Sequence, residues 1–352
     1  MSSSPVSSNS NKTFTLDPSD DLSFLSTYLT RVTTGVKDIA GNTLSSQYNT
    51  SYGLTTYGIW LISTNGGVYL TSSDNGTTWT RRTLSGNQTL RGLSFGDGTF
   101  VMGGSEHNTT SKSDYWTSSD GLNWTQRDDF MSKPSQAYAA NGITYGNNTW
   151  VMVSNEGSLW TSSDAVSWDN RTKYTGVWKD YLIDKQFNEV TFGNNTFVIV
   201  GQKGVLLTSS DNGTSWDNRT SGSTTAFLED IAFGNNTFIA TGYLPGTSNG
   251  ITISSSDNGT TWDNVTTPIT NKTWGGVAYG NDTFVIGGNS GTILSSSDNG
   301  TTWDNRTNSS YNDTSYNLTR VSFGNGVFVA VGVSGTILTS SCLLYTSPSP
   351  RD

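Results

Sequence analysis

Cysteine and histidine are almost absent from this chain. The sequence has one cysteine and one histidine, and charged residues make up 13% of its 352 residues. The histidine, His107, lies in a polar insert, where we expect an ordinary surface-loop residue. A zinc site needs several cysteine or histidine ligands, so we predict no metal and no cofactor.

Basic residues and long hydrophobic runs are scarce as well. The 19 lysines and arginines are outnumbered by 28 aspartates and glutamates, which gives a net charge of −9. Basic residues that displace counterions from phosphates provide much of the affinity for nucleic acid, so nucleic acid is not an expected partner. We also expect no transmembrane segment, because no apolar run has the required length. Residues 1–11 show no signal-peptide pattern, so we expect any secretion leader to be removed or to lie upstream.

Aromatic residues, in contrast, are plentiful and regularly spaced. They make up 12% of the chain, which is too many for a disordered protein. A motif of the type S-x-D-x-G-x-T-W recurs, with its aspartates separated by 46, 44, 47, 46 and 41 residues. Each repeat contains four short apolar runs bounded by Gly and Asn turns, which indicates β-hairpins. A fixed period of this length indicates a repeat architecture.

The repeats predict an all-β fold: a seven-bladed β-propeller of four-stranded antiparallel blades. Six repeats are complete, whereas the seventh, at about 318–341, lacks a fourth strand. Residues 28–33 fit that missing strand, so we expect Tyr28–Val32 to pair with residues 335–340 and close the ring. The predicted divisions are a polar N-terminal arm at 1–27, the propeller at 28–341 and a tail at 342–352.

The tail begins at Cys342 and interrupts the seventh motif where its aspartate is expected. Its sequence, CLLYTSPSPRD, resembles the translation of a transposon-end adapter used in sequencing libraries. We therefore predict that residues 342–352 are not native to the protein.

Each repeated motif places an aspartate and a tryptophan at equivalent positions. An aspartate can accept backbone N–H groups across a tight turn, and we expect the tryptophan to pack between blades. Calcium binding is the alternative role for the aspartates, but one carboxylate per turn falls short of the coordination that calcium requires. The predicted structural residues are Asp74, Asp120, Asp164, Asp211, Asp257, Asp298, Trp79, Trp124, Trp168, Trp216, Trp262 and Trp303.

This motif resembles the Asp-box, or BNR repeat, of sialidase-type propellers. From about residue 53 to 341, the wider repeat is similar to photosystem II assembly-factor-like propellers. The resemblance implies the propeller fold, but Asp-boxes occur in proteins of many functions. A sialidase would carry an Arg-Ile-Pro motif and converging arginines. That motif is absent. Five arginines occupy the same position in five different repeats, so they should be spread around the ring and cannot converge. They are Arg82, Arg127, Arg171, Arg219 and Arg306.

Two rows of aromatic residues are expected to form the core between blades. The first-strand row consists of Tyr57, Phe95, Tyr145, Phe192, Phe233, Tyr279 and Phe323. The second-strand row consists of Trp60, Phe100, Trp150, Phe197, Phe238, Phe284 and Phe328.

Acidic residues outside the repeat pattern are candidates for a glycosidase mechanism with paired carboxylates. They are Glu106, Glu156, Asp180, Asp184, Glu189 and Glu229. No phosphate loop, nucleophile elbow or nucleotide-binding fingerprint occurs. We predict that the chain is not an enzyme, and a glycoside hydrolase, sialidase-like or other, with an axial pocket is the alternative.

The segment 173–187 departs most from the repeat. Its residues Trp178, Lys179, Asp180 and Tyr181 form a candidate binding patch, because exposed Trp and Tyr often anchor interfaces. A loop that caps the propeller with its own aromatics is the favoured interpretation.

N-x-Ser/Thr sequons are unusually dense and indicate N-glycosylation of a translocated protein. An unglycosylated protein with turns rich in Asn and Thr is the alternative. The main candidate acceptors are Asn75, Asn87, Asn108, Asn147, Asn194, Asn212, Asn218, Asn235, Asn258, Asn271, Asn281, Asn299, Asn305, Asn312 and Asn317. Asn170 and Asn264 are further sequons of the same type.

Together these patterns predict a non-catalytic extracellular or cell-surface propeller. It would act as a structural, adhesive or protein-interaction subunit, with a protein or glycan partner or by self-assembly into a larger assembly or filament. An assembly-factor-like partner of a membrane complex is a further alternative.

Overall fold

A computed structural model divides the chain into two compact units, Met1–Ile59 and Trp60–Asp352. The structure describes residues 58–85, 88–106, 115–127, 140–154, 157–172, 185–308 and 316–340, together with the backbone pairing of several short strands outside these ranges. Within the described ranges, no helix has the length and hydrophobicity needed to span a bilayer.

The N-terminal unit contains three short antiparallel strand pairs. They are β1 (Val6–Ser8) with β2 (Thr13–Thr15), β3 (Thr27–Tyr28) with β6 (Leu54–Thr55), and β4 (Arg31–Val32) with β5 (Tyr48–Asn49).

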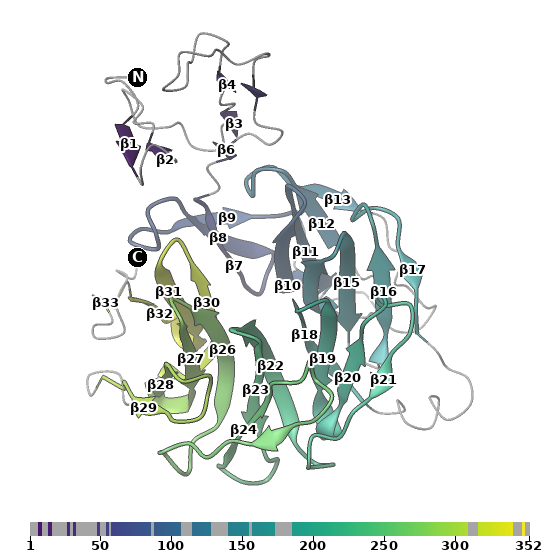
Figure 1. Cartoon of the computed structure of the whole chain (residues 1–352), viewed down its shortest axis with the longest axis vertical. Helices are drawn as coiled ribbons and strands as arrows, with labels where there is room; N and C mark the ends of the chain where they lie inside the picture. Colours follow the sequence, from purple (N-terminus) through teal and green to yellow (C-terminus); the bar gives the residue numbers. More distant parts are fainter. Residues whose placement is uncertain are drawn as a thin grey trace. The chain divides into compact units, whose positions relative to one another are not determined.

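The second unit consists of seven antiparallel sheets, which are the blades of a propeller (Figure 1). Blade 1 has β7 (Trp60–Ser63), β8 (Val68–Ser72) and β9 (Thr80–Thr83). Blade 2 has β10 (Gln88–Gly96), β11 (Thr99–Glu106), β12 (Tyr115–Ser118) and β13 (Thr125–Arg127). Blade 3 has β14 (Ala140–Gly146), β15 (Thr149–Ser154), β16 (Leu159–Ser162) and β17 (Asp169–Asn170).

The remaining blades repeat the same order. Blade 4 has β18 (Phe187–Gly193), β19 (Thr196–Gly201), β20 (Leu206–Ser209) and β21 (Asp217–Asn218). Blade 5 has β22 (Phe227–Gly234), β23 (Thr237–Tyr243), β24 (Gly250–Ser255) and β25 (Asp263–Asn264). Blade 6 has β26 (Trp274–Gly280), β27 (Thr283–Gly288), β28 (Ile293–Ser296) and β29 (Asp304–Asn305). Blade 7 has β30 (Leu318–Gly324), β31 (Val327–Gly332), β32 (Ile337–Ser340) and β33 (Ser347–Pro348).

Single turns of 3-10 helix join the second and third strands of three blades. These turns are η2 (Gln202–Gly204), η3 (Asn289–Gly291) and η6 (Val333–Gly335). The seven-bladed, all-β architecture with four-stranded blades is confirmed. Only blade 1 has three assigned strands, and residues 56–57, where its first strand is expected, lie outside the described residues.

The core lies between the blades, as predicted for most of the second-strand row. The described residues of the first-strand row are instead half-buried, and Phe95 is 39% exposed. Phe197, Phe238 and Phe284 of the second-strand row are fully buried. First- and second-strand aromatics pair in register across each hairpin, with ring centroids 4.5–5.0 Å apart. Glycines at the ends of the first strands lie against the aromatic ring of the next blade, as Gly193 does against Phe233. A side chain at these glycines would therefore push the blades apart.

The predicted closure of the ring by an N-terminal strand is wrong. Tyr28 pairs with Leu54 and Val32 pairs with Tyr48, all within the N-terminal unit. The open edge of β32 pairs instead with β33, which lies in the tail. An open edge needs a hydrogen-bonding partner, and a strand a few residues along the chain reaches it with a smaller loss of conformational entropy than a distant one.

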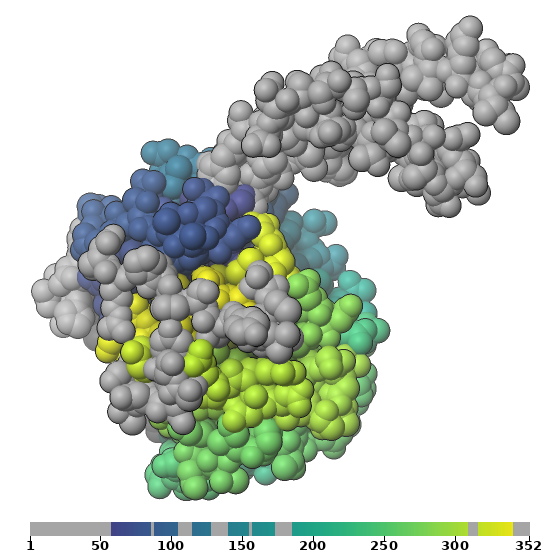
Figure 2. All heavy atoms as spheres, turned by 90° about the vertical axis from the view of Figure 1, so that its left-hand side faces the viewer, coloured from purple at the N-terminus to yellow at the C-terminus, as the bar shows by residue number. Residues whose placement is uncertain are grey.

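Side-chain contacts hold blade 7 against blade 1. The Gly324 backbone lies against the Trp60 ring, where the equivalent glycines of five other blades meet a first-strand aromatic. Asn325 donates a hydrogen bond to Asn75 across this boundary. Figure 2 shows the two blades side by side, blade 1 in dark blue and blade 7 in yellow. Among the described residues, side-chain packing and the Asn325–Asn75 hydrogen bond hold blade 7 against blade 1, whereas the pairing of β33 with β32 completes blade 7 itself.

Candidate functional site

The first strands carry a β-bulge at the same place in six blades. The pairing register shifts at Leu90/Leu93, Ala140/Gly142, Phe187/Glu189, Leu228/Asp230, Trp274/Gly276 and Leu318/Arg320. A bulge leaves one residue unpaired and redirects the neighbouring side chains, and bulges are frequent beside functional sites. Here it presents residues of each first strand to the axis of the propeller.

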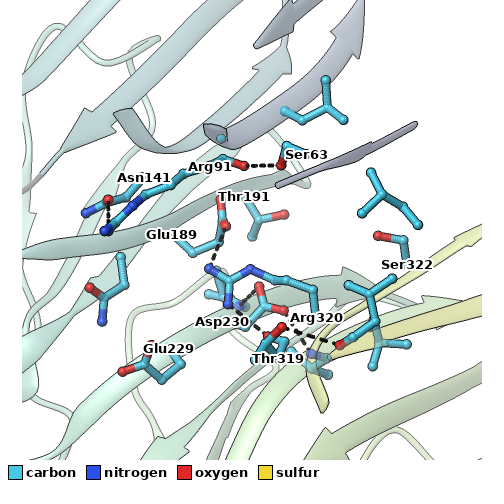
Figure 3. Close-up of a pocket in the computed structure, with 18 of the residues that line it drawn as sticks. Ser63, Arg91, Asn141, Glu189, Thr191, Glu229, Asp230, Thr319, Arg320 and Ser322 are labelled. Atoms are coloured by element: carbon cyan, nitrogen blue, oxygen red, sulfur yellow. Dashed lines mark hydrogen bonds and ion pairs between the residues drawn. The ribbon is translucent and has the colours of Figure 1, made fainter. Parts of the chain in front are cut away.

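These residues line a cavity of about 600 Å³, which we call the axial pocket (Figure 3). Its apolar wall includes Trp60, Ile62 and Val329. Its charged and amide-bearing residues are Arg91, Asn141, Asn188, Glu189, Glu229, Asp230 and Arg320.

One guanidinium lies among three carboxylates in the axial pocket. Arg320 Nη2 lies 3.7 Å from Glu189 Oε2, and Arg320 Nη1 donates to the Thr319 carbonyl at 3.1 Å. The Arg320 side chain keeps 40% of its surface accessible and that of Glu189 keeps 18%. Asp230 and Glu229 also act electrostatically on Arg320. Blades 4, 5 and 7 therefore meet in one charge cluster.

Asp230 connects two neighbouring blades. Its Oδ1 accepts the backbone N–H of Ile231 in its own strand at 2.9 Å, and its Oδ2 accepts that of Val277 in blade 6 at 2.9 Å. The residue is 5% exposed. A buried carboxylate that accepts two N–H groups stabilises both strands and would leave both donors unpaired if removed.

The environment shifts the protonation of the whole cluster. Burial raises the pKa of Glu189 to about 8, although Arg320 opposes the shift. Burial also raises the pKa values of Glu229 and Asp230, again against the attraction of Arg320. Burial disfavours the charge of Arg320, but Asp230 and the two glutamates outweigh it and raise the arginine's pKa. At neutral pH, Glu189 therefore holds a proton while Arg320 stays charged.

The other side of the pocket is polar but less charged. Arg91 Nη1 donates to Asn141 Oδ1 at 3.0 Å, and Asn141 Nδ2 donates to the Phe187 carbonyl of the next blade at 2.8 Å. Asn188 makes the equivalent bond to the Leu228 carbonyl at 2.8 Å. The bulged asparagines thus link blade 3 to blade 4 and blade 4 to blade 5.

Glycines occupy the position of Glu189, Asp230 and Arg320 in the other described first strands. A Cβ on Gly142 would lie 2.8 Å from the Glu189 Cα, and one on Gly276 would lie 2.6 Å from the Arg320 Cα. The strands approach too closely for a side chain at these two positions. The charged cluster is therefore restricted to the blades in which a side chain fits.

The repeated motifs lie away from this pocket, in the turns between the third and fourth strands. In blade 6, Asp298 Oδ1 accepts the Ser296 hydroxyl at 2.7 Å and the Thr302 N–H at 2.9 Å, and Oδ2 accepts the Thr302 hydroxyl at 2.6 Å. The Thr302 hydroxyl, with its N–H, lowers the pKa of Asp298 to about 2. These bonds recur at Asp74, Asp211 and Asp257, and the shorter turns at Asp120 and Asp164 also use backbone N–H donors.

The motif tryptophans close the same turns and pack between blades. Trp79 Nε1 donates to the Gly76 carbonyl at 3.0 Å. The Trp124 ring meets Tyr69 of the preceding blade edge-on at 5.9 Å, and Trp168 meets Tyr115 at 6.0 Å.

The arginines predicted to be dispersed do not converge. Each donates its Nε–H to a hydroxyl on the third strand of its own blade, in the pairs Arg82–Thr71, Arg127–Thr117, Arg171–Thr161, Arg219–Thr208 and Arg306–Ser295. No carboxylate-binding arginine cluster forms from these five residues.

Several predicted site residues lie outside the described residues. They are His107, Glu156, the candidate patch Trp178, Lys179, Asp180 and Tyr181, and also Asp184, Asn87, Asn108 and Asn312. The side chain of Glu106 lies outside them too. Of the acidic candidates, the structure brings Glu189 and Glu229 together in the axial pocket. Among the described residues, no group of three or more His, Cys, Asp or Glu is arranged to hold a metal ion.

Sequence analysis missed Asp230, Arg320, Arg91 and the bulged asparagines. A usable signal was the residue just before the valine, leucine or isoleucine of each first strand. Aligned on that position, the blades read Gly92, Gly142, Glu189, Asp230, Gly276 and Arg320. A position that holds glycine in three repeats and a charged residue in the other three indicates a candidate functional site.

Fold and pocket together define the chain as a seven-bladed β-propeller with a polar axial pocket. Residues 1–56 match the family described as a bacterial Ig-like domain. No curated protein sequence matches the chain.

Solved structures share the propeller fold. YCF48 bound to D1 peptide is 17% identical, with a TM-score of 0.60, over 80% of this chain and 87% of that one. YCF48 from Cyanidioschyzon merolae is 18% identical, with a TM-score of 0.60, over 80% and 91% of the two chains. The GH74 enzyme of Niastella koreensis is 13% identical, with a TM-score of 0.61, over 83% of this chain and 52% of the enzyme. At these identities the similarity shows the fold alone.

Proposed function

We propose that this chain is a non-catalytic extracellular or cell-surface propeller that acts as a protein-interaction or structural subunit. The observation that carries this proposal is the commitment of the axial charges to the fold. Asp230 joins blades 5 and 6, and Glu189 faces Arg320 of blade 7. Residues that connect blades in this way have a structural role, which favours a non-catalytic function.

A protein partner is supported by the type of fold. The structure of YCF48 is that of a complex with D1 peptide. In our chain, the axial pocket offers an apolar wall beside charged and amide groups, a mixture that suits a peptide or a glycan chain. A partner that inserts one residue into the axial pocket would form buried polar contacts there, and such binding needs no catalytic step.

The extracellular location is supported by the density of sequons and by the match of residues 1–56 to a bacterial Ig-like domain. Intact cells labelled with a membrane-impermeant amine reagent should yield the chain labelled at Lys203, which lies on the propeller surface. Absence of label on intact cells, with labelling after lysis, would contradict the location.

The partner is tested by cross-linking on the same cells. A lysine-reactive cross-linker should join Lys203 or Lys272 to a second polypeptide, which mass spectrometry then identifies. Links to a second copy of the chain would favour self-assembly over a different partner, and links only within the chain would contradict a partner within reach of these lysines.

A glycoside hydrolase is the second candidate, and one observation favours it. Glu189 keeps its proton to about pH 8 and lies near other carboxylates in a pocket. Glycosidases use two carboxyl groups that flank the scissile bond, one of which the environment keeps protonated. Hydrolysis of a β-glucan polysaccharide by the wild-type chain, lost in Glu189→Gln and in Glu229→Gln, would establish this function and reject the non-catalytic one.

A further inference from the structure

Asparagine side chains form hydrogen bonds between neighbouring blades, which we call Asn rungs. Each rung joins the turn between the first two strands of one blade to the motif turn of the next blade. The Nδ2–O distances are 2.8 Å for Asn147 to Asn212, 2.6 Å for Asn194 to Asn258, and 2.8 Å for Asn235 to Asn299. A fourth rung, from Asn325 to Asn75 at 3.2 Å, crosses the boundary between blades 7 and 1.

The rungs explain why asparagine recurs in these turns. Asn147, Asn194 and Asn235 have φ values of 43–46°, and Asn212 has a φ of 58°. Asparagine tolerates this left-handed backbone better than other residues with a side chain. Unlike glycine, it also supplies a carboxamide that can reach the next blade.

The rungs have a direction, and the direction matters for N-glycosylation. In this reaction the Nδ2 of asparagine bonds to C1 of a sugar, loses a proton, and displaces the diphosphate of a lipid-activated oligosaccharide. The turn asparagines Asn147, Asn194 and Asn235 donate that same nitrogen to the next blade. Each would have to break its rung before an enzyme could modify it.

A second group of sequon asparagines has the opposite arrangement. These rim asparagines, Asn170, Asn218, Asn264 and Asn305, lie exposed in the two-residue fourth strands of blades 3 to 6. Asn170 and Asn305 accept the N–H of Thr172 and Thr307 through Oδ1, at 2.8 and 2.9 Å. Within the described part of the chain, no hydrogen bond uses the Nδ2 of the rim asparagines.

We propose that the rim asparagines are N-glycan acceptors of the folded propeller, whereas Asn147, Asn194 and Asn235, which donate Nδ2 to the rungs, stay unmodified. The glycans would then form a band around the outer strands of blades 3 to 6. In the organism this rests on the extracellular location proposed above. The division into two groups depends only on the folded structure, so it can be tested without knowing the location.

The test uses the purified, folded full chain. It is incubated with a single-subunit oligosaccharyltransferase that reads N-x-Ser/Thr and with its lipid-linked oligosaccharide, and mass spectrometry measures occupancy at each site. Synthetic peptides of the same sequons report the intrinsic preference of the enzyme. Tryptic peptides are unsuitable as substrates, because Arg171, Arg219 and Arg306 lie inside the rim sequons.

For each site, the measured quantity is the occupancy in the folded chain divided by the occupancy in the matching peptide. This ratio should be at least about fivefold lower at the turn asparagines than at the rim asparagines, because a rung hydrogen bond must open first. Equal ratios at the turn and rim asparagines would overturn the proposal. Absence of modification at the rim of the folded chain would overturn it as well.

A variant tests the cause directly. Asn212→Gly removes the acceptor of Asn147, and glycine adopts the left-handed backbone at position 212 without strain. Occupancy at Asn147 should rise about fivefold, whereas Asn194, whose acceptor Asn258 is intact, should not change. An unchanged Asn147 would show that the rung does not protect it.

Discussion

The motif turns and the axial pocket use the same repeat in opposite ways. In the turns, the Ser–Asp hydroxyl bond recurs in six blades at 2.7–2.9 Å, with the same residue types each time. At the axis, an identical bulge carries glycine in some blades and Glu189, Asp230 or Arg320 in others. Uniform turns stabilise each blade, whereas differences at the axis concentrate charge at one place.

Close backbone approach at the axis should give the largest effect. In Gly276→Ala the new Cβ would lie 2.6 Å from the Arg320 Cα, a backbone atom that cannot move aside easily. We expect a loss of about 3 kcal/mol in the free energy of unfolding, measured by urea denaturation.

The control is Gly326→Ala, which has open space around its Cβ but a φ of +75°. It should cost about 1 kcal/mol through its backbone conformation alone. Equal losses in the two variants would mean that the axial strands can separate without penalty.

Loss of the Asp230 connection should come next. Asp230→Asn keeps the size of the side chain but can accept only one of the two N–H groups of Ile231 and Val277. We expect about 2 kcal/mol of destabilisation from the unpaired buried donor. Glu229→Gln changes the adjacent carboxylate, which makes no hydrogen bond to any residue that the structure describes, and should stay within about 0.5 kcal/mol of wild type. A larger loss of stability in Glu229→Gln than in Asp230→Asn would mean that Asp230 is not the residue that connects the two blades.

Glu189 should make stability depend on pH. Its pKa rises from an ordinary 4.5 to about 8 on folding, so the folded state holds a proton that the unfolded state has released. Its contribution is complete below about pH 4.5 and is lost as pH rises towards 8, by at most about 1.4 kcal/mol per unit. Thermal unfolding from pH 5 to 8 should show a shallower slope in Glu189→Gln than in wild type, because Glu229 and Asp230, whose pKa values are also raised, still titrate in the variant. Parallel curves would contradict the raised pKa.

The smallest effect is expected at a motif turn. Asp298→Asn should cost about 0.5 kcal/mol near neutral pH, because water partly replaces these exposed bonds. The folded carboxyl has a pKa of about 2 against an ordinary 3.8, so this contribution is present above pH 3.8 and is lost as pH falls through 2. Wild type and variant should therefore converge in acid. Asp304→Asn, in the exposed pair with Arg306, is the matched control and should have a smaller effect.

The repeat allowed the architecture to be predicted because each copy carries its own strand and turn signals. The spacing of the six motifs indicated seven blades, and the aromatic rows indicated the buried contacts between them. Glu189 and Glu229 stood out as acidic residues outside the pattern. Asp230 and Arg320 did not stand out. Arg320 is far from Glu189 and Glu229 in sequence, and it approaches these two glutamates only because blades 4, 5 and 7 surround one axis.

The failed prediction of ring closure has a related cause. Tyr28 to Arg31 matched the fourth-strand pattern at two residues only, which is too little to choose a partner for an open edge. Strand pairing at an edge depends on which segment lies nearest in space. The structure pairs these residues within the N-terminal unit and leaves β33 beside β32.

By itself, the sequence determined the blade: where strands and turns fall, which aromatics pair across each hairpin, and how many copies follow one another. These properties depend on neighbours within one repeat, and local patterns record them. Tertiary structure alone decided which charges share the axial pocket, which strand completes the last blade, and which asparagine nitrogens are occupied. Those properties depend on distances between blades, and no local pattern contains that information.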